Sequence, residues 1–547
     1  MFLERPPTET KSDPRVRRAV LPTRIVWQQG DVEGTEFLLH NDSGQALIQA
    51  KPGCRLRGAG TSLLLDFGRE LHGGVQLVVG PTGDYGPTQL RLRFGESVSE
   101  AMIGPLNHHS LGDWQVAMPS MASQEFGLTG FRFVRIDLLE DRELPLTACR
   151  AMTLMRDLPP VGAFACSDER LNRVWQTGAD TVHLCLQDYV WDGIKRDRAV
   201  WIGDLHPEAA VVSAVWGNLD IVPQSLDWAR DHAPLPAWMN GIGSYSKWWI
   251  ILQRDWYMAH GDRDYLEAQR GYLVALLPAL AEQIQSDGKP QWRGRLFLDW
   301  PSSGQPEAVD AGLTALLVMA LRAGAELCAT LGETSTGEQA LHAADRLQRP
   351  ALPWPNKQAS ALLGLAGVHD LAEVNGQVLA RDPLRGLSTF YGYYVLQARA
   401  GAGDFAGCLE VIRRYWGAML DLGATSFWED FDLGWTENAA RIDELATDGR
   451  HDVHAKYGDH CYKGLRHSLC HGWAAGPTAW LSEHVLGVRP LSPGCRRVAV
   501  RPYLGDLDWV EGAYPTPYGP ITLRHERGSN GEISSRVEAP PEVEVIR

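Results

Sequence analysis

Hydrophobic and polar residues alternate in the first part of the chain. Residues 89–95 and 131–137 alternate strictly between apolar and polar side chains. Alternation over about five to seven residues predicts half-buried antiparallel strands. Residues 62–79 add two short apolar runs separated by glycine-rich turns. We therefore expect an N-terminal β-sandwich domain over residues 1–157.

After about residue 158 the spacing changes to the helical period. Apolar side chains then recur three and four positions apart, at Leu171, Val174, Trp175, Ala179, Val182 and Leu186. Ser167 precedes this run and acids follow it in the first turn, so we expect Ser167 to cap the helix. Similar stretches cover residues 246–261, 272–284, 311–331, 359–371, 387–401, 406–422 and 468–486. This periodicity predicts an all-α domain over residues 158–487.

The last part of the chain returns to strand-like alternation. Residues 496–502, 507–511 and 521–525 are short alternating segments interrupted by proline and glycine. They predict a C-terminal β-sandwich domain over residues 488–547. Three domains agree with the 547-residue length, which is too great for one ordinary core.

Composition and charge exclude several classes of partner. The net charge of −15 disfavours nucleic acid and anionic membrane surfaces. The nine cysteines form no C-x-x-C pair, which argues against a disulfide framework and against a structural zinc site. Residues 1–9 lack the apolar segment of a secretory signal, and no run of 18 apolar residues follows. We expect a cytoplasmic protein that contacts neither membrane nor nucleic acid.

The densest cluster of charge is Asp192-Gly-Ile-Lys-Arg-Asp-Arg-Ala-Val-Trp-Ile-Gly-Asp204. Three acids and three cations in one glycine-containing stretch are hard to explain by packing, since Asp and Arg are rarely buried unless paired. A carboxylate beside guanidinium groups and an indole can have its pKa set for proton transfer. A solvated surface loop is the alternative, and Trp191 and Trp201 argue against it. The pattern favours an active site.

A second candidate group is Glu429, in Gly423-Ala-Thr-Ser-Phe-Trp-Glu-Asp-Phe431. Neighbouring aromatic rings desolvate a carboxyl and raise its pKa, which suits a general acid or base. A helix-terminal acid or a salt-bridge partner is the structural alternative. A third candidate is His471 in Ser468-Leu-Cys-His-Gly-Trp473, where a buried structural histidine is the alternative.

Tryptophan is the fourth clue, with 20 residues in the chain. Indole rings offer flat apolar faces to a pyranose and a polar N–H at the edge. Most of them are expected to pack in the core. Trp300 and the neighbouring Asp299 are the preferred loop candidates for sugar contact, followed by Trp249, Trp238 and Tyr245.

The segment 192–204 resembles the catalytic-loop signature of the α-L-rhamnosidases of glycoside hydrolase family 78, roughly Asp-Gly-Pro-x-Arg-Glu-Arg-x-x-Trp-x-Gly-Asp. The matching residues are Asp192, Gly193, Arg196, Arg198, Trp201, Gly203 and Asp204. Asp197 stands where the family has its general-acid Glu. The shorter side chain withdraws the carboxyl by about 1.5 Å. Backbone movement, a different substrate or weak activity are the possible consequences.

The other motifs resemble the same family. Residues 425–431 are similar to its Thr-Thr-x-Trp-Glu-Arg-Trp, whose Glu is the general base, so Glu429 inherits that role, and Asp430 replaces the usual Arg. Residues 468–473 are similar to its Ser-Leu-Asn-His-Tyr-Ala, so His471 falls on the substrate-binding histidine and Cys470 replaces Asn. Both β-rich regions also look like domains of this family.

The resemblance implies a multidomain protein with an all-α (α/α)6 barrel catalytic domain flanked by two β-sandwich domains. It implies an inverting hydrolase of terminal α-L-rhamnosyl or closely related residues, with Asp197 as acid and Glu429 as base. The expected substrate-binding residues are Asp192, Arg196, Trp201, Asp204, Trp249, Asp299, Trp300 and His471. No metal or cofactor is expected, and the partner is a small oligosaccharide or glycoside. The oligomeric state stays open, with a homodimer as one alternative.

Three alternatives remain at this stage. One is another (α/α)6 sugar enzyme, with a different glycone or with phosphate as the acceptor. A second is a non-catalytic carbohydrate-binding relative, suggested by Asp197 and Asp430. The third concerns the acid itself, because the longer Glu208 side chain is an alternative donor if Asp197 cannot reach the substrate.

Overall fold

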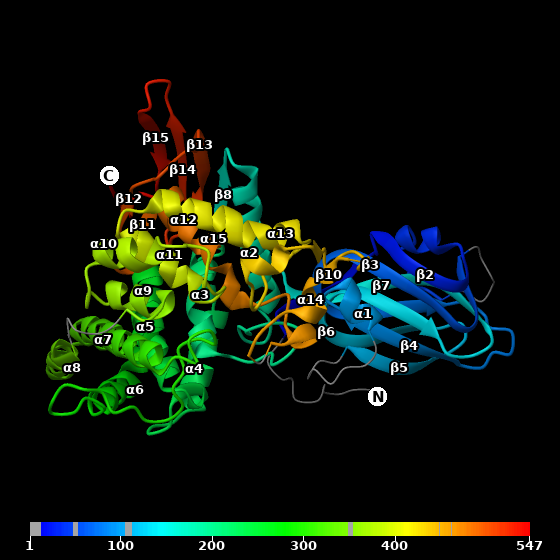
Figure 1. Cartoon of the computed structure of the whole chain (residues 1–547), viewed down its shortest axis with the longest axis horizontal. Helices are drawn as coiled ribbons and strands as arrows, with labels where there is room; N and C mark the ends of the chain where they lie inside the picture. Colours follow the sequence, from blue (N-terminus) through cyan, green and yellow to red (C-terminus); the bar gives the residue numbers. More distant parts are fainter. Residues whose placement is uncertain (1–12, 47–52, 104–111, 348–353, 448, 461) are drawn as a thin grey trace, which may run out of the picture.

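The computed structural model describes residues 13–46, 53–103, 112–347, 354–447, 449–460 and 462–547. The N-terminal segment 1–9, considered above for a secretory signal, lies outside them. The molecule is elongated (Figure 1). Strands of the N-terminal domain form one end, helices fill the other, and the C-terminal strands stand beside the helices.

The N-terminal domain is built on one hydrogen-bonded sheet, with seven strands among the described residues. These strands are β1 Arg15–Val20, β2 Arg24–Glu33, β3 Cys54–Val79, β4 Thr88–Gly95, β5 Asp113–Met118, β6 Ser123–Leu138 and β7 Glu143–Arg156. The order is β1-β7-β3-β6-β4-β5, and β2 pairs with β3. The two apolar runs predicted at residues 62–79 belong to one long strand, whose register with β6 shifts between Asp66 and Leu71.

This domain has its own hydrophobic core. Fully buried side chains such as Leu63, Leu65 and Leu77 alternate along β3, as the period of two requires. The short helix α1, Val98–Met102, is capped by Ser97, whose hydroxyl accepts a hydrogen bond from the backbone N–H of Glu100 (3.1 Å). α1 lies against the helical domain, where the N–H of Val98 bonds to the carbonyl of Ile442 (2.8 Å).

The helical domain is a closed ring. Its longer helices are α2 Glu169–Cys185, α3 Ile202–Val215, α4 Ile221–Asp231, α5 Gly243–His260, α6 Arg263–Ala281, α7 Pro306–Leu331, α8 Thr334–Leu347, α9 Lys357–Leu365 and α11 Gly392–Gly401. The shorter helices are α10 Leu371–Val374, α12 Phe405–Val411, α13 Gly417–Asp421, α14 Val453–Lys456 and α15 Gly476–Trp480. In the described part of the domain, α3, α5, α7, α9, α11 and α15 each contact the next, and α15 returns to α3. The other long helices lie outside this ring, which is the inner layer of an (α/α)6 barrel.

Helix α7 is long and apolar enough, by length and composition alone, to cross a membrane. However, 83% of its most apolar window is buried inside the domain. A helix that is apolar around its whole circumference is either a core helix or a membrane span. The burial of α7 inside the domain agrees with a core helix.

Several of the predicted helix limits differ from the structure; for example, α6 spans Arg263–Ala281 instead of 272–284. Asp168, not Ser167, caps α2, and its carboxylate accepts from the N–H groups of Arg170 and Leu171. In the segment 468–486, which was predicted to be one helix, α-helix begins only at Gly476; His471 is extended, and Gly472–Ala475 form a 3-10 turn. By contrast, residues 406–422 are helical almost throughout, with a π-helical turn at Ile412–Trp416 joining α12 to α13.

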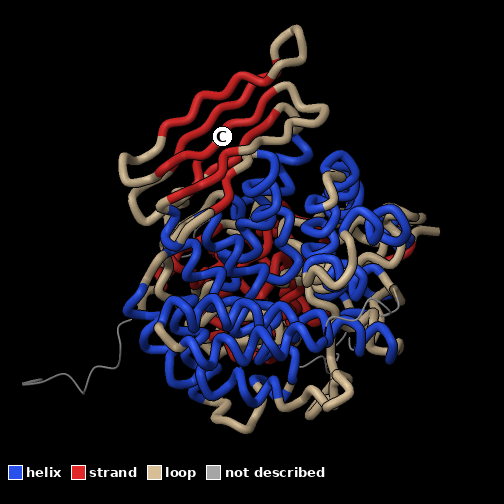
Figure 2. The backbone as a smooth tube through the Cα atoms, turned by 90° about the vertical axis from the view of Figure 1, so that its left-hand side faces the viewer, coloured by secondary structure: helices blue, strands red, loops and turns tan. Residues whose placement is uncertain are grey.

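The C-terminal domain consists of two small sheets (Figure 2). β11 Val488–Pro490, β12 Arg497–Val500 and β16 Glu544–Ile546 form one, and β13 Trp509–Tyr514, β14 Ile521–Arg527 and β15 Ile533–Glu538 form most of the other. The fourth strand of the second sheet is β8, Ala163–Cys166, which pairs antiparallel with β13. Apolar side chains such as Val510 and Ile521 share one core with the helices. The two segments are therefore joined by packing as well as by sequence.

Candidate active site

A cavity of about 260 Å³ opens where the N-terminal ends of α3, α5 and α15 meet the loop before α7. It is lined by Asp192, Arg196, Asp197, Trp201, Asp204, Ile242, Tyr245, Arg295, Phe297, Trp300, Glu429, Tyr462, Arg466, His471 and Trp473. The three sequence motifs thus converge on one place. Eight of the ten predicted site residues line this cavity.

Asp192 lies in the loop between α2 and α3, at the buried end of the cavity. Its Oδ1 accepts a hydrogen bond from the backbone N–H of Ala199 (2.9 Å), which closes the loop on itself. Burial raises the pKa of this carboxyl well above its usual value, and the neighbouring Asp204 raises it further. The backbone carbonyl of Asp192 accepts from Gly472 (2.8 Å), so the loop is also tied to the segment of His471.

Asp204 lies in the first turn of α3, where the helix dipole favours a carboxylate. The hydroxyl of Tyr245, on α5, donates to its Oδ1 (3.1 Å). Burial nevertheless raises the pKa of Asp204 well above its usual value. The Trp201 ring packs edge-on against Tyr245, with 6.1 Å between ring centroids. Asp192 and Asp204 are therefore two buried acids suited to hydrogen-bonding sugar hydroxyls.

Glu429 is fixed from two sides. Its Oε2 accepts from Nη2 of Arg196 and from the backbone N–H of Ser468 (3.1 Å). Its own carbonyl accepts from Thr389 (2.6 Å) and from the indole N–H of Trp473 (2.9 Å). Burial raises the pKa of the carboxyl, while the charge and hydrogen bond of Arg196 oppose that rise. A buried carboxylate held by one cation is suited to act as a base.

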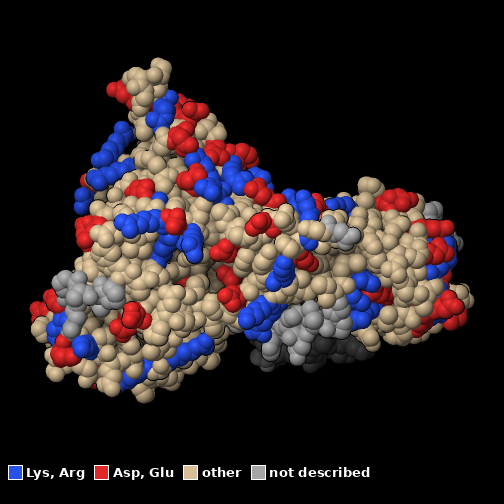
Figure 3. Space-filling view, viewed as in Figure 1, with Lys and Arg blue, Asp and Glu red and all other residues tan. Residues whose placement is uncertain are grey.

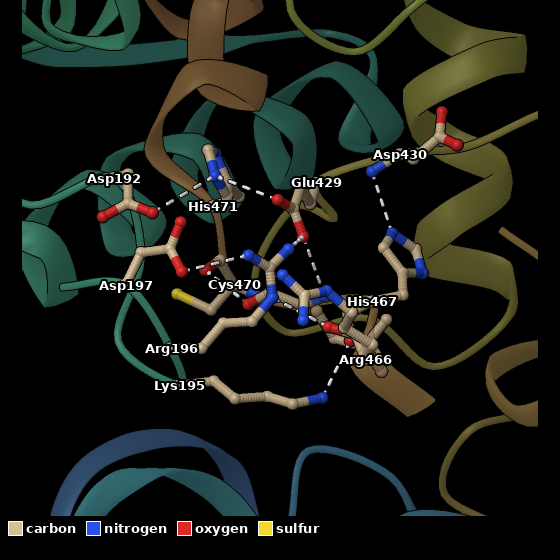
Figure 4. Close-up of polar contacts among 12 residues, drawn as sticks. Asp192, Lys195, Arg196, Asp197, Glu429, Asp430, Arg466, His467, Cys470 and His471 are labelled. Atoms are coloured by element: carbon tan, nitrogen blue, oxygen red, sulfur yellow. Dashed lines mark hydrogen bonds and ion pairs between the residues drawn. The ribbon is translucent and has the colours of Figure 1, made fainter. Parts of the chain in front are cut away.

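Asp197 lies on the other side of the same guanidinium (Figure 4). Its Oδ1 is 3.5 Å from Nη1 of Arg196, whereas Glu429 contacts Nη2. The Asp197 side chain is 36% exposed, so its carboxyl is open to solvent, unlike that of Glu429. Asp197 and Arg198 both have left-handed backbone, with φ of 54° and 53°. Such strain in non-glycine residues is uncommon and clusters at functional sites.

His471 stands among the acids of the cavity. Its Nε2 lies 3.6 Å from Oε1 of Glu429, 3.8 Å from Asp192 and 3.9 Å from Asp204. Burial lowers the pKa of the imidazole well below its usual value, so the ring is neutral. The ring packs on Trp473, with 4.2 Å between centroids. The structure places His471 at the cavity wall, where the sequence predicted a binding residue.

Two predicted binding residues lie outside the cavity wall. Trp249 is fully buried, and its indole N–H donates to the carbonyl of Leu226 (3.2 Å), so the expectation of sugar contact is corrected to a packing role. Asp299 is also buried, and its carboxylate accepts from the N–H of Ser302 (3.0 Å) and the hydroxyl of Ser388 (3.1 Å). It therefore orders the loop that carries Trp300, rather than lining the main cavity itself.

Two further acids considered in the sequence analysis, Glu208 and Asp430, do not line the main cavity. Glu208 does not line the cavity: it is buried against Gly472, where a Cβ would meet its Oε1 at 1.6 Å. It is therefore not the alternative acid. Asp430 turns away from Glu429 (Figure 4), and burial raises its pKa to about 7. Its substitution for Arg adds no carboxylate to the main cavity lining.

Acids of the N-terminal domain contact the loops that form this site. The buried ammonium of Lys195 lies 2.7 Å from Glu100 and 3.3 Å from Glu96, and donates to the carbonyls of Leu465 (2.7 Å) and His467 (2.8 Å). Glu96 also accepts from the backbone N–H of Leu469 (2.6 Å). Glu96 of the β-domain thus fixes the backbone of Leu469. The N–H of the preceding residue, Ser468, donates to the carboxylate of Glu429.

The same cluster is the one place among the described residues where three potential metal ligands lie together, namely Glu96, Glu100 and His454. The donor set does not fit an added cation, because the Lys195 ammonium already forms ion pairs with both carboxylates and occupies the space beside them. Both ring nitrogens of His454 are also engaged, with Ser97 (2.7 Å) and the carbonyl of His467 (2.8 Å).

Several cavity residues were missed by sequence reasoning: Ile242, Arg295, Phe297, Tyr462, Arg466 and Trp473. Trp473 falls inside the segment 468–473 considered above, Phe297 lies two residues before Asp299, and Arg466 lies two residues before Ser468. Nearness to these segments was the available signal. Arg295 and Tyr462 lie in loops outside them. Only the fold brings those loops to the cavity.

Comparison with known proteins identifies two of the domains. Residues 159–349 match the family model of the bacterial alpha-L-rhamnosidase six-hairpin glycosidase domain, and residues 487–546 match that of the bacterial alpha-L-rhamnosidase C-terminal domain. The predicted resemblance and the fold class, an (α/α)6 domain between two β-domains, are confirmed. No curated protein sequence matches the chain.

Solved structures of rhamnosidases share the fold. The family 78 rhamnosidase of Bacillus sp. GL1 superposes with a TM-score of 0.75 at 23% identity over 93% of this chain, and the α-L-rhamnosidase of Dictyoglomus thermophilum with 0.73 at 17% over 98%. The chain spans only 55% and 59% of their lengths. A Klebsiella oxytoca rhamnosidase solved with rhamnose bound gives 0.68 at 19% identity, covering 86% of this chain and 96% of that one.

Proposed function

We propose that this chain is a glycoside hydrolase that removes terminal α-L-rhamnosyl or closely related residues by inversion. The matches of residues 159–349 and 487–546 to the six-hairpin glycosidase and C-terminal domain models of the bacterial α-L-rhamnosidases support this proposal. The substrate is a small oligosaccharide or glycoside. The rhamnose bound in the Klebsiella relative supports this choice of glycone.

The observation that carries the proposal is the position of one guanidinium between two carboxylates. Arg196 contacts Glu429 through Nη2 and faces Asp197 through Nη1 (3.5 Å), so the two acids lie on opposite sides of it. A single displacement needs one acid at the leaving oxygen and one base at a water on the opposite face, with room for that water between them. The guanidinium keeps the two carboxyl groups out of direct contact, which supports two separate roles for them.

In the proposed reaction, Asp197 donates its proton to the glycosidic oxygen as the bond to the anomeric carbon breaks. Glu429 accepts a proton from the attacking water, whose oxygen forms the new bond from the other face. The products are a free sugar of inverted configuration and a protonated leaving group. Asp192, Asp204 and His471 hold the sugar hydroxyls, and Trp201 and Trp300 supply apolar faces.

The protein is proposed to work in the cytoplasm. The cysteines of the described chain are all unpaired and buried, as is usual in a reducing compartment. Fractionation of the producing cells, with enzyme activity measured in each fraction, tests this. Activity confined to the secreted fraction would contradict it.

The test of function is hydrolysis of 4-nitrophenyl α-L-rhamnopyranoside, with the product anomer followed by NMR. Wild type is expected to release the β-anomer first. Asp197→Asn and Glu429→Gln are each expected to lose more than about 100-fold in kcat. Glu410→Gln, an equal charge change at an exposed site on α12 (55% exposed side chain), serves as the matched control. Release of the α-anomer would overturn the single displacement, and wild type inactive on a panel of rhamnosides would overturn the function.

A further inference from the structure

Two arginines of the cavity wall have no acidic partner among the residues that the structure describes. Arg295 and Arg466 both line the cavity, yet neither forms an ion pair or donates a side-chain hydrogen bond to any residue that the structure describes. The third arginine of the wall, Arg196, is paired with Glu429. We propose that Arg295 and Arg466 form a subsite for an anionic group on the leaving group, such as the carboxylate of a uronic acid. This inference rests on the proposed function and names the substrate class of the same site.

Arg466 carries the stronger half of the argument. Its Nε is buried from solvent and has no hydrogen-bond partner in the described chain. A buried guanidinium N–H without an acceptor is costly, and such groups are normally paired. The main chain of Arg466 is fixed, because its carbonyl accepts from Nε of Arg196 (2.9 Å). A ligand oxygen reaching this wall would supply the missing acceptor.

Arg295 is held at the cavity by aromatic rings instead of by acids. Its guanidinium carbon lies 5.6 Å from the ring centre of Phe297 and 5.5 Å from that of Trp300. Stacking on rings orients the planar group and leaves its N–H edges available. A stacked guanidinium of this kind matches a carboxylate by two parallel hydrogen bonds.

The position of Arg295 places this subsite on the side of the leaving group. The buried acids Asp192 and Asp204 mark the closed end of the cavity, where the terminal sugar binds in the proposed function. Arg295 is exposed and Asp197, the proposed acid at the leaving oxygen, is partly exposed. Trp300, stacked by Arg295, continues the same wall. An anionic group on the next residue of the substrate would therefore face the guanidinium groups, rather than the buried acids.

Two arginines facing an acid would also suit inorganic phosphate as the attacking species. That alternative predicts a different product, a sugar 1-phosphate, and a rate that depends on phosphate. The experiment separates the two sources of negative charge.

The test compares α-L-rhamnosyl-(1→4)-D-glucuronate with α-L-rhamnosyl-(1→4)-D-glucose, which differ by one carboxylate. Wild type is expected to favour the glucuronate by about tenfold or more in kcat/KM at low salt. The preference should shrink as salt is raised, because the guanidinium of Arg295 is exposed to solvent and is therefore screened. In Arg295→Gln and Arg466→Gln the ratio of the two kcat/KM values should fall towards one. Arg293→Gln, an exposed arginine two residues from Arg295 (62% exposed side chain), should keep the wild-type ratio.

Three results would overturn the subsite. One is equal cleavage of both disaccharides by wild type, which would leave the proposed hydrolase function intact. Another is loss of activity on both substrates to the same degree in Arg466→Gln, which would assign Arg466 to the terminal sugar. The last is a phosphate-dependent rate with rhamnose 1-phosphate as product. Failure of wild type on both disaccharides and on simple rhamnosides would instead count against the function itself.

Discussion

At the scale of single residues, Arg196 sets the charge of the site. It donates to Glu429 and lies beside Asp197, so one cation serves both proposed catalytic acids. The pKa of Glu429 is raised by burial and lowered by this guanidinium. The ionised base that hydrolysis requires therefore depends on Arg196.

Replacing this cation should move the pH profile. Arg196→Gln removes the charge that opposes burial, so the pKa of Glu429 should rise. A base must be ionised, and therefore the acidic limb of kcat/KM should shift to higher pH by roughly 1–2 units. The measurement is the pH dependence of kcat/KM on an aryl rhamnoside. Arg198→Gln, whose guanidinium donates to the carbonyl of Leu128 (3.0 Å), is the control. An unmoved limb in Arg196→Gln would contradict the assignment of Glu429.

Glu208 offers a test of stability. Burial raises its pKa well above the usual value, so the folded protein keeps a proton that the unfolded chain releases. The resulting cost is absent at pH values below the ordinary pKa, grows as the pH rises from the ordinary towards the raised value, and is constant above the raised value. Glu208→Met should therefore stabilise the protein by about 1–3 kcal/mol at pH 8 and change little at pH 4.

Thermal unfolding at the two pH values measures this difference. The same variant should keep its activity, because Glu208 does not line the cavity. A stability change of equal size at both pH values would show that packing, rather than the charge, governs this position.

The sequence could predict motif residues but not the neighbours of each tryptophan. Trp300 and Trp249 looked alike as candidates, yet one lies at the cavity and the other bonds to Leu226 inside the domain. The two tryptophans differ in whether the side chain points into the cavity or into the packed core, and this depends on the three-dimensional arrangement of the helices and loops. Arg295 and Arg466 could not be predicted for the same reason. Arg295 lies four residues before Asp299 and Arg466 two residues before Ser468, but nearness in sequence does not show which side chains face the cavity.

At the scale of elements, an ion cluster joins the β-domain to the loops that line the cavity. Lys195 lies beside Glu96 and Glu100, all buried or nearly so. The loop that carries Glu96 precedes α1, and the loop that carries Lys195 precedes α3. The position of Glu429 thus depends on an element of another domain, through Leu469 and Ser468.

Removing the ammonium group of Lys195 should lower the free energy of unfolding. Lys195→Met leaves two acids without their charge partner, and breaking a buried pair typically costs about 3–5 kcal/mol. The triple variant Lys195→Met, Glu96→Gln, Glu100→Gln should recover part of that loss. Chemical unfolding of both variants and wild type measures the recovery. If the triple variant were less stable than the single one, the charge imbalance would not be the cause.

Hydrogen bonds to residues distant in sequence explain why the helix predicted from residue 468 begins only at Gly476. Apolar spacing continued through residues 468–475, but carboxylates take the backbone N–H groups of Ser468 and Leu469. The N–H of His471 bonds to the carbonyl of Phe427 (2.9 Å). Period alone cannot register such long-range partners, whereas the uninterrupted helices α5 and α7 were predicted correctly.

At the scale of the whole molecule, the three regions differ in whether each has a hydrophobic core of its own. The N-terminal sheet has its own core, while the C-terminal strands share theirs with the helices. On the face in Figure 3, acidic and basic side chains are interspersed over all regions, so the net charge of −15 is not gathered into one acidic field there. Local charge in the cavity can therefore differ in sign from the total.

Truncation tests this division. A chain ending at residue 487 would leave β8 without its partner β13 and would expose the apolar residues that pack against Val510 and Ile521. We expect it to be insoluble or to unfold at least 10 °C earlier than the full chain, because a shared core is lost. Solubility and thermal unfolding measure this. A well-folded truncated protein would show that the helices form a complete unit alone.

The pairing of β8 with β13 also has a consequence for synthesis. β8 leaves the ribosome about 340 residues before the strand it pairs with. At roughly 5–20 residues per second, this edge waits on the order of half a minute. During that time Phe164 and its neighbours remain uncovered on a nascent helical domain. Translation speed and chaperone supply should therefore limit the yield of this protein more strongly than its final stability does.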